Sequence, residues 1–156
     1  MLARDRGILF LATGCGTGKI PRAPGTFGSL LGLALAWGIS GWPSSLNFAF
    51  IAIFSVLAVW VSHRAAEILH AKDPGSIVID EIVGILFACA GLKLTAGTAV
   101  TAFFLFRLFD ILKPFPVGWL DRRIRGGLGI VADDVAAGIL ANLTIRCGKW
   151  LLAAMT

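Results

Sequence analysis

Four long apolar stretches alternate with short charged segments along the chain. They cover residues 26–42, 46–62, 82–106 and 135–155. A helix that crosses a bilayer needs about 20 apolar residues, with about 17 as a lower limit. The first two stretches are separated only by a short Pro-Ser-Ser turn, so they predict a hairpin of two membrane helices.

The third stretch is interrupted by Lys93 and by Thr95-Ala96-Gly97. One continuous helix would put the basic segment after Arg107 outside the cell, against the positive-inside rule. A second hairpin, with helices over 76–92 and 95–112, instead puts all three charged linkers on one side of the membrane. The last stretch carries Arg146 and Lys149, which either snorkel to the far interface or face other helices.

This pattern predicts an all-α fold, a compact helical membrane bundle of about four to six helices with the charged loops gathered on the cytoplasmic side. We expect residues 1–156 to form a single domain. Composition agrees, since 57% of the 156 residues are hydrophobic and 15% are charged. A soluble domain of this size carries about 25% charged residues. The net charge of +5 lies in segments between apolar runs, which favours a membrane surface over nucleic acid.

Two adjacent acidic pairs stand directly before apolar segments. Asp80-Glu81 precedes Ile82, and Asp133-Asp134 precedes Val135, so each pair is expected where a helix begins. One acid suffices to cap a helix, a contribution of about 1 kcal/mol. Two adjacent acids beside a bilayer repel each other, and a shared hard cation such as Mg²⁺ relieves that repulsion. Capping alone remains the alternative for each pair.

Two further segments carry cations. Arg107, Asp110 and Lys113 recur at a spacing of three and share one helical face, either as a ladder of ion pairs or as a ligand flanked by two phosphate-binding cations. A glycine-rich segment before Lys19 and Arg22 leads to a helix start near Thr26. It lacks the Walker A pattern. Two interpretations stay open: an anion-binding loop, or a flexible loop with cations at the membrane interface.

Four segments together resemble the phosphatidylglycerophosphatase A family of bacterial membrane phosphatases. They are residues 18–30, 73–84, 106–116 and 126–138, including the runs Ala-Pro-Gly-Thr-Phe-Gly-Ser, Ile-Asp-Glu-Ile-Val-Gly and Ala-Asp-Asp-Val-Ala-Ala-Gly. The resemblance implies Mg²⁺-dependent hydrolysis of phosphatidylglycerophosphate to phosphatidylglycerol and inorganic phosphate. It also implies a multi-pass protein of the bacterial cytoplasmic (inner) membrane with its active site facing the cytoplasm.

On this hypothesis the acidic residues bind the metal and the cations bind the phosphate. The expected metal ligands are Asp80, Glu81, Asp110, Asp133 and Asp134. The expected catalytic residues are Asp80, Glu81, Asp110, Arg107, Lys113 and Asp134, and the expected substrate-binding residues are Lys19, Arg22, Thr26, Arg107 and Lys113. The expected partners are the lipid substrate and the membrane, with no nucleic acid. The sequence leaves homo-oligomerisation open.

Two alternatives compete with this hypothesis. A non-enzymatic small membrane transporter or scaffold protein would use its acids for ions or partner contacts, but it would place charges along a path within the membrane rather than at one face. A CDP-alcohol phosphotransferase also uses Mg²⁺ and acts on lipids. Its spaced D-x-x-D-G run with a downstream D-x-x-x-D is absent here.

Overall fold

The computed structural model of the chain describes residues 3–72 and 74–155, and all regular elements within them are helical. In chain order the elements are α1 (Ala3–Ala12), the short 3-10 helix η1 (Thr17–Lys19), α2 (Pro24–Gly38), α3 (Ser44–Ile68), α4 (Ile79–Cys89), α5 (Ala96–Leu112), α6 (Val117–Arg123) and α7 (Gly126–Ala154). The expected all-α class is therefore confirmed. The described residues form seven α-helices rather than four to six, because α1 and α6 lie in segments expected to be charged linkers.

Both predicted helical hairpins are present, and local sequence explains their ends. Of their four helices as the structure describes them, only α3 is long and apolar enough to cross a bilayer, because α2 has 15 residues and α4 only 11. Pro24 opens α2 at a position where its fixed φ suits the first helical turn. The hydroxyl of Thr95 caps α5 by accepting a hydrogen bond from the Thr98 amide at 3.2 Å. Lys113 adopts a left-handed conformation after the last turn of α5, and Pro114 follows it.

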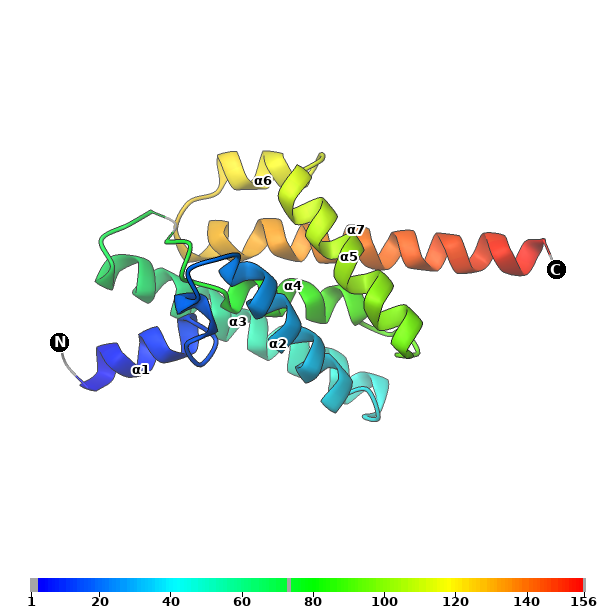
Figure 1. Cartoon of the computed structure of the whole chain (residues 1–156), viewed down its shortest axis with the longest axis horizontal. Coiled ribbons are helices and arrows are strands. Elements are labelled where there is room, and N and C mark those ends of the chain that lie inside the picture. The colour runs from blue at the N-terminus through cyan, green and yellow to red at the C-terminus, as the bar shows by residue number, and fades with distance from the viewer. Residues whose placement is uncertain (1–2, 73, 156) are drawn as a thin grey trace.

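The hairpin turns and the charged linkers lie at opposite ends of the molecule. The α2–α3 and α4–α5 turns lie at one end, towards the right of Figure 1, whereas the segments around α1, the α3–α4 linker and the α6–α7 linker lie towards the left. The structure thus groups the linkers as the second hairpin requires. Which side of a membrane they face stays a prediction.

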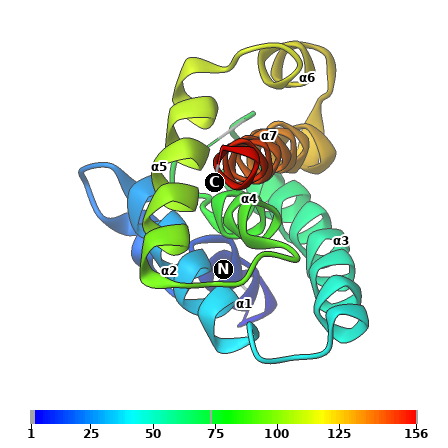
Figure 2. The same cartoon turned by 90° about the vertical axis from the view of Figure 1, so that its right-hand side faces the viewer.

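Helices α4 and α7 pack side by side at the centre, and α2, α3 and α5 surround them (Figure 2). Helix α4 has 11 residues, eight of them apolar, and it is almost entirely buried by its neighbours. The main hydrophobic cluster includes Ile85 and Leu86 of α4, Phe106 of α5 and Ala137 of α7. The short α4 is therefore held by packing on all sides.

Two helices of the described residues, α3 and α7, are long and apolar enough to cross a bilayer. Only 17% of the apolar window of α3 is buried inside the protein, and its Ile53 and Val56 are 71% and 73% exposed. Large apolar side chains exposed in this number mark a surface that contacts lipid or another protein. This surface agrees with the membrane character expected from composition.

The cations of the last helix face other helices. Arg146 donates through Nε to Asn142 Oδ1 at 2.7 Å and through Nη2 to the carbonyl of Ala90 at 3.0 Å. Lys149 donates to the hydroxyl of Thr98 at 3.2 Å. Asn142 itself donates its amide to the carbonyls that end α4, those of Phe87, Ala88 and Ala90. Of the two expected arrangements, these bonds support contact with neighbouring helices.

Candidate metal and phosphate site

Three carboxylates from two helices meet in the interior of the bundle. One carboxylate oxygen from each of Asp80, Glu81 and Asp134 lies within 4.8 Å of the others. Asp80 and Asp134 are buried, and the side chain of Glu81 is 16% exposed. We call these three residues the acidic cluster. Three acids so close together repel one another strongly unless protons or a cation compensate their charge.

The two acidic pairs occupy different positions in their helices. Asp80 and Glu81 lie in the first turn of α4, as expected, where the helix dipole favours negative charge. Asp133 and Asp134 do not precede a helix, because α7 begins at Gly126 and contains both. The prediction for this pair was wrong because tertiary packing overrides the weak helical tendency of the glycine-rich start. A Cβ at Gly127 would collide with the backbone of α3 at Val59, so glycine lets α7 begin in close contact with α3.

Close backbone contact between α4 and α7 brings the acids together. A Cβ at Gly138 would overlap the carbonyl oxygen of Gly84, and a Cβ at Gly84 would lie 2.9 Å from the carbonyl oxygen of Asp134 and overlap the ring of Phe106. Small residues allow helices to approach this closely. The packing role that the sequence suggested for Gly84 and Gly138 is therefore the feature that assembles the acidic cluster.

Arg107 and Asp110 of α5 lie beside the cluster. The Arg107 guanidinium donates to Asp110 Oδ2 at 2.7 Å and lies 3.9 Å from Glu81 Oε1. Their side chains are 18% and 16% exposed. Arg107 therefore borders the cluster with one edge held by Asp110. The structure places Asp110 next to the three-carboxylate group rather than within it.

The start of α2 forms another wall of the site. A Cβ at Gly25 would overlap Glu81 Oε1 and lie 3.0 Å from Arg107 Nη1. Only glycine admits those side chains so close to the α2 backbone, a requirement that the sequence reading missed. The Pro-Gly dipeptide at the helix start was the available signal. Thr26, one residue further on, is half-buried.

Lys113 and Asp133 form a separate group with Asp121 of α6. Lys113 Nζ lies 2.9 Å from Asp133 Oδ2 and 2.9 Å from Asp121 Oδ1. Asp121 was not among the expected site residues. Lys113 therefore pairs with Asp133 and Asp121 beside the acidic cluster. The predicted roles of Lys113 at the phosphate and of Asp133 at the metal stay predictions.

Lys19 and Arg22 lie on the surface of the glycine-rich loop. Both are exposed, and within the described part of the chain neither forms an ion pair. Gly18, next to Lys19, packs directly against the carbonyl of Ser76, so the loop is attached to the segment that leads into α4. Asp73, the first residue of one segment in the family resemblance, lies outside the described residues.

The chemistry of the acidic cluster fits a hard divalent cation. Its ligands are carboxylate oxygens, which such cations prefer. Glu81 Oε2 is buried and accepts no hydrogen bond from the described residues. Burial disfavours the charged form of the Glu81 carboxyl and raises its pKa above the usual value, although the nearby Arg107 opposes the rise. A bound cation would remove this penalty and leave the carboxylates ionised.

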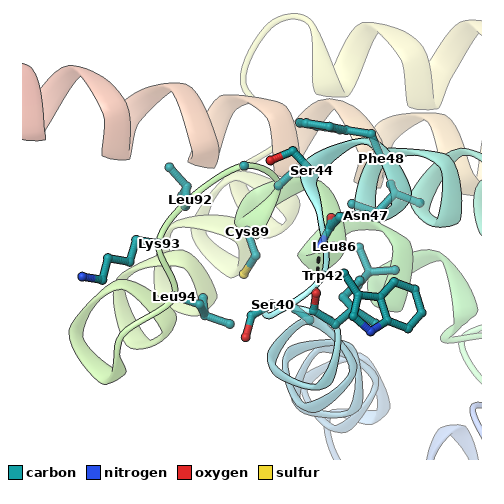
Figure 3. Close-up of a pocket in the computed structure, with 15 residues that line it drawn as sticks. Ser40, Trp42, Ser44, Asn47, Phe48, Leu86, Cys89, Leu92, Lys93 and Leu94 are labelled. Carbon is teal, nitrogen blue, oxygen red and sulfur yellow. Dashed lines mark hydrogen bonds between the residues drawn. The ribbon is translucent and has the colours of Figure 1, made fainter.

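A cavity of about 240 Å³ lies at the opposite end of the bundle, between the α2–α3 turn and the α4–α5 turn (Figure 3). Its lining includes Trp42, Asn47, Cys89 and Lys93, and Asn47 donates to the carbonyl of Ile39 at 3.1 Å. Among the residues that the structure describes, its lining shares no member with the acidic cluster and includes no carboxylate. The candidate site is therefore the acidic cluster with Arg107 and the α2 start.

Comparison with known proteins gives a consistent result. The model of the family described as Phosphatidylglycerophosphatase A matches residues 10–149. A protein of Haemophilus influenzae named Phosphatidylglycerophosphatase A is 39% identical over 148 residues, covering 93% of this chain and 91% of that protein. The Escherichia coli protein of the same name is 35% identical over 132 residues, covering 84% of this chain and 77% of that protein. A Bacteroides thetaiotaomicron protein provisionally named a phosphatidylinositol-3-phosphatase is 31% identical over 160 residues, covering 92% of this chain and 94% of that protein. No solved structure matches the chain.

Proposed function

This chain belongs to the phosphatidylglycerophosphatase A family, and from that premise we propose that it hydrolyses the phosphate monoester of phosphatidylglycerophosphate in the bacterial inner membrane. The products are phosphatidylglycerol and inorganic phosphate. The observation that carries the proposal is the acidic cluster beside Arg107, because it pairs carboxylates for a divalent cation with a cation for the phosphate. The chain is thus a phosphatase, and the transporter or scaffold alternative is not favoured.

We propose that Asp80, Glu81 and Asp134 hold Mg²⁺. When bound, the metal supplies neutralisation of the phosphate charge and polarisation of the phosphoryl group. The buried Glu81 Oε2 without a hydrogen-bond donor supports this role, since a cation would satisfy it. Asp110 keeps a different task in this proposal, because its carboxylate orients Arg107 at 2.7 Å.

Arg107 is the proposed phosphate-binding cation. Its guanidinium has five donors, and the bond to Asp110 leaves others to reach phosphate oxygens as negative charge moves to the leaving group. The start of α2 at Gly25 lies against the same guanidinium, so the helix dipole adds positive potential there. We keep Thr26 as a candidate phosphate donor. Lys19 and Arg22 are candidates for contacts to the outer part of the lipid head group.

The depth of the cluster along α7 suits a lipid head group. The residues from Asp134 to Ala154 extend roughly 30 Å at about 1.5 Å each, which matches the hydrocarbon thickness of a bilayer. If α7 crosses the membrane over this length, Asp134 lies at the boundary where phospholipid phosphates begin. The charged linkers then lie on the same side as the cluster, which the positive-inside rule assigns to the cytoplasm.

The test is phosphate release by the purified chain in detergent micelles containing phosphatidylglycerophosphate. We expect release with Mg²⁺, loss of release with EDTA, and a fall of at least about 100-fold for Asp134→Asn. Glu67→Gln is the matched control, since Glu67 is an exposed carboxylate paired with Arg64. Phosphatidylinositol 3-phosphate serves as the competing substrate. Faster release from phosphatidylinositol 3-phosphate would indicate the activity for which the Bacteroides relative is named. Release from neither lipid would contradict the proposal.

A further inference from the structure

We propose that Lys113 and Asp133 form a positioning pair, which fixes the rotation of α7 so that Asp134 faces the acidic cluster, and that neither residue contacts the metal or the phosphate. The inference rests on the proposed function. It assigns to two residues a role different from the one that their types suggest in the sequence.

Contacts from three helices fix Lys113. It follows the last residue of α5 in a left-handed conformation with φ of 46°. A Cβ on Gly118 of α6 would lie only 2.6 Å from the carbonyl oxygen of Lys113. The backbone of Lys113 therefore packs tightly against α6. Its ammonium bonds to Asp121 of α6 and to Asp133 of α7 at 2.9 Å each. The side chain therefore joins α5, α6 and α7 at one point.

Helical geometry explains why Asp133 and Asp134 have different partners. Successive residues on an α-helix point about 100° apart, so one face of α7 cannot direct both side chains to the same point. Asp134 faces α4 and the acidic cluster, and Asp133 faces Lys113. The Asp133 side chain is 10% exposed, and a carboxylate buried to that extent needs a partner. Lys113 supplies it, and the pair resists rotation of α7 in either direction.

The charge of Lys113 is secure. Partial burial disfavours its charge, but the hydrogen bonds and negative charges of Asp121 and Asp133 outweigh burial and raise the pKa of the ammonium. Two of its three N–H donors are already used by these carboxylates. The Lys113 ammonium is thus charged and already bonded to two carboxylates. This arrangement suits a residue that holds helices in place better than one that binds phosphate.

A double-mutant cycle with Lys113→Met and Asp133→Asn tests the inference. The readouts are Mn²⁺ binding followed by electron paramagnetic resonance, and kcat and KM for lipid phosphate hydrolysis. Lys113→Met leaves the buried Asp133 charge without its cation, so we expect Mn²⁺ affinity and kcat to fall about 10- to 100-fold with KM unchanged. Asp133→Asn alone should lower Mn²⁺ affinity and kcat by less than about 10-fold. Both quantities should return in the double variant to their values in Asp133→Asn. Lys113→Arg, which keeps the pair, should retain near-normal values.

Three results would overturn the inference. Asp133→Asn removing Mn²⁺ binding as fully as Asp134→Asn would make Asp133 a metal ligand. A raised KM with unchanged Mn²⁺ binding in Lys113→Met would make Lys113 a phosphate ligand. A double variant no better than Lys113→Met would show that the two residues act independently. If Lys113→Met fails to fold, the comparison of Asp133→Asn with Asp134→Asn decides. Normal Mn²⁺ binding and hydrolysis in Asp134→Asn would contradict the proposed function itself, which keeps the two failures separate.

Discussion

Gly138 of α7 lies against Gly84 of α4 so closely that a methyl group on Gly138 would overlap the Gly84 carbonyl oxygen. This contact sets the distance between the two helices that carry the acidic cluster. The geometry of the site therefore depends on two residues that have no side chain.

We expect Gly84→Ala to separate α4 from α7 and to reduce both stability and activity. The added Cβ would meet Phe106 and the Asp134 carbonyl, and overpacking of this kind costs about 1–3 kcal/mol. Thermal unfolding in detergent and phosphate release measure the two effects. Gly148→Ala is the matched control, because a Cβ there meets nothing within 4 Å. Equal stability and activity in the two variants would show that the helix contact is not limiting.

We expect Arg107→Ala to lower kcat/KM for the lipid phosphate by about 100- to 1,000-fold, the usual loss when one charged transition-state contact is removed. The kcat/KM of Arg107→Lys should lie between those of the parent and Arg107→Ala. Lysine keeps the charge but loses the planar guanidinium that can bind phosphate oxygens and Asp110 together. Arg64→Ala, which removes a half-buried arginine paired with Glu67 on α3, provides the control. A normal kcat/KM in Arg107→Ala would remove Arg107 from the phosphate site.

Mg²⁺ should stabilise the folded protein as well as activate it. A ligand that binds only the native state adds about 2.7 kcal/mol at 100 times its dissociation constant, so the Tm should rise with Mg²⁺ concentration and fall with EDTA. The shift should vanish in Glu81→Gln and Asp134→Asn, which each remove one carboxylate of the cluster. The same Mg²⁺ shift in these variants and in the parent would locate the metal elsewhere.

Asn142→Leu should destabilise the protein by about 1–3 kcal/mol without changing the metal site directly. The leucine has a similar volume but leaves the carbonyls at the end of α4 without their amide donor. Unfolding in detergent measures the loss, and hydrolysis per folded molecule should remain close to normal. Thr144→Ala, an exposed change on the same helix, should have little effect. A stable Asn142→Leu variant would show that other groups satisfy α4.

The apolar pattern predicts where the helices of the two hairpins lie, but it overestimates the length of α4, which has 11 residues and is held by packing rather than by a membrane-length apolar run. The turn near Lys93 and the end of α5 before Pro114 follow from local chemistry. The start of α7 does not, because its glycine-rich segment has a weak helical tendency and packs closely against α3 at Val59, a contact that the sequence does not reveal. That error also concealed the position of the second acidic pair within the helix.

The candidate site shows the same division. The sequence identifies the acidic pairs and the helical face that carries Arg107, Asp110 and Lys113, since charged residues are rare in this chain. It cannot tell which acids share a point in space, because that depends on how α4 and α7 cross at Gly84 and Gly138. The partners of Lys113 were hidden for a similar reason, since Asp121 and Asp133 reach it only when α6 folds back beside α7.

The bonds from Asn142 and Arg146 to the end of α4 have a mechanical consequence. Helix α4 is held against α7 by the close contact of Gly84 with Gly138 and, at its C-terminal end, by these side chains. We therefore expect α4 and α7 to move together as one unit. We expect any opening that admits a lipid head group to come from the glycine-rich loop with α2 and from the α5–α6 corner, which pack around these two helices.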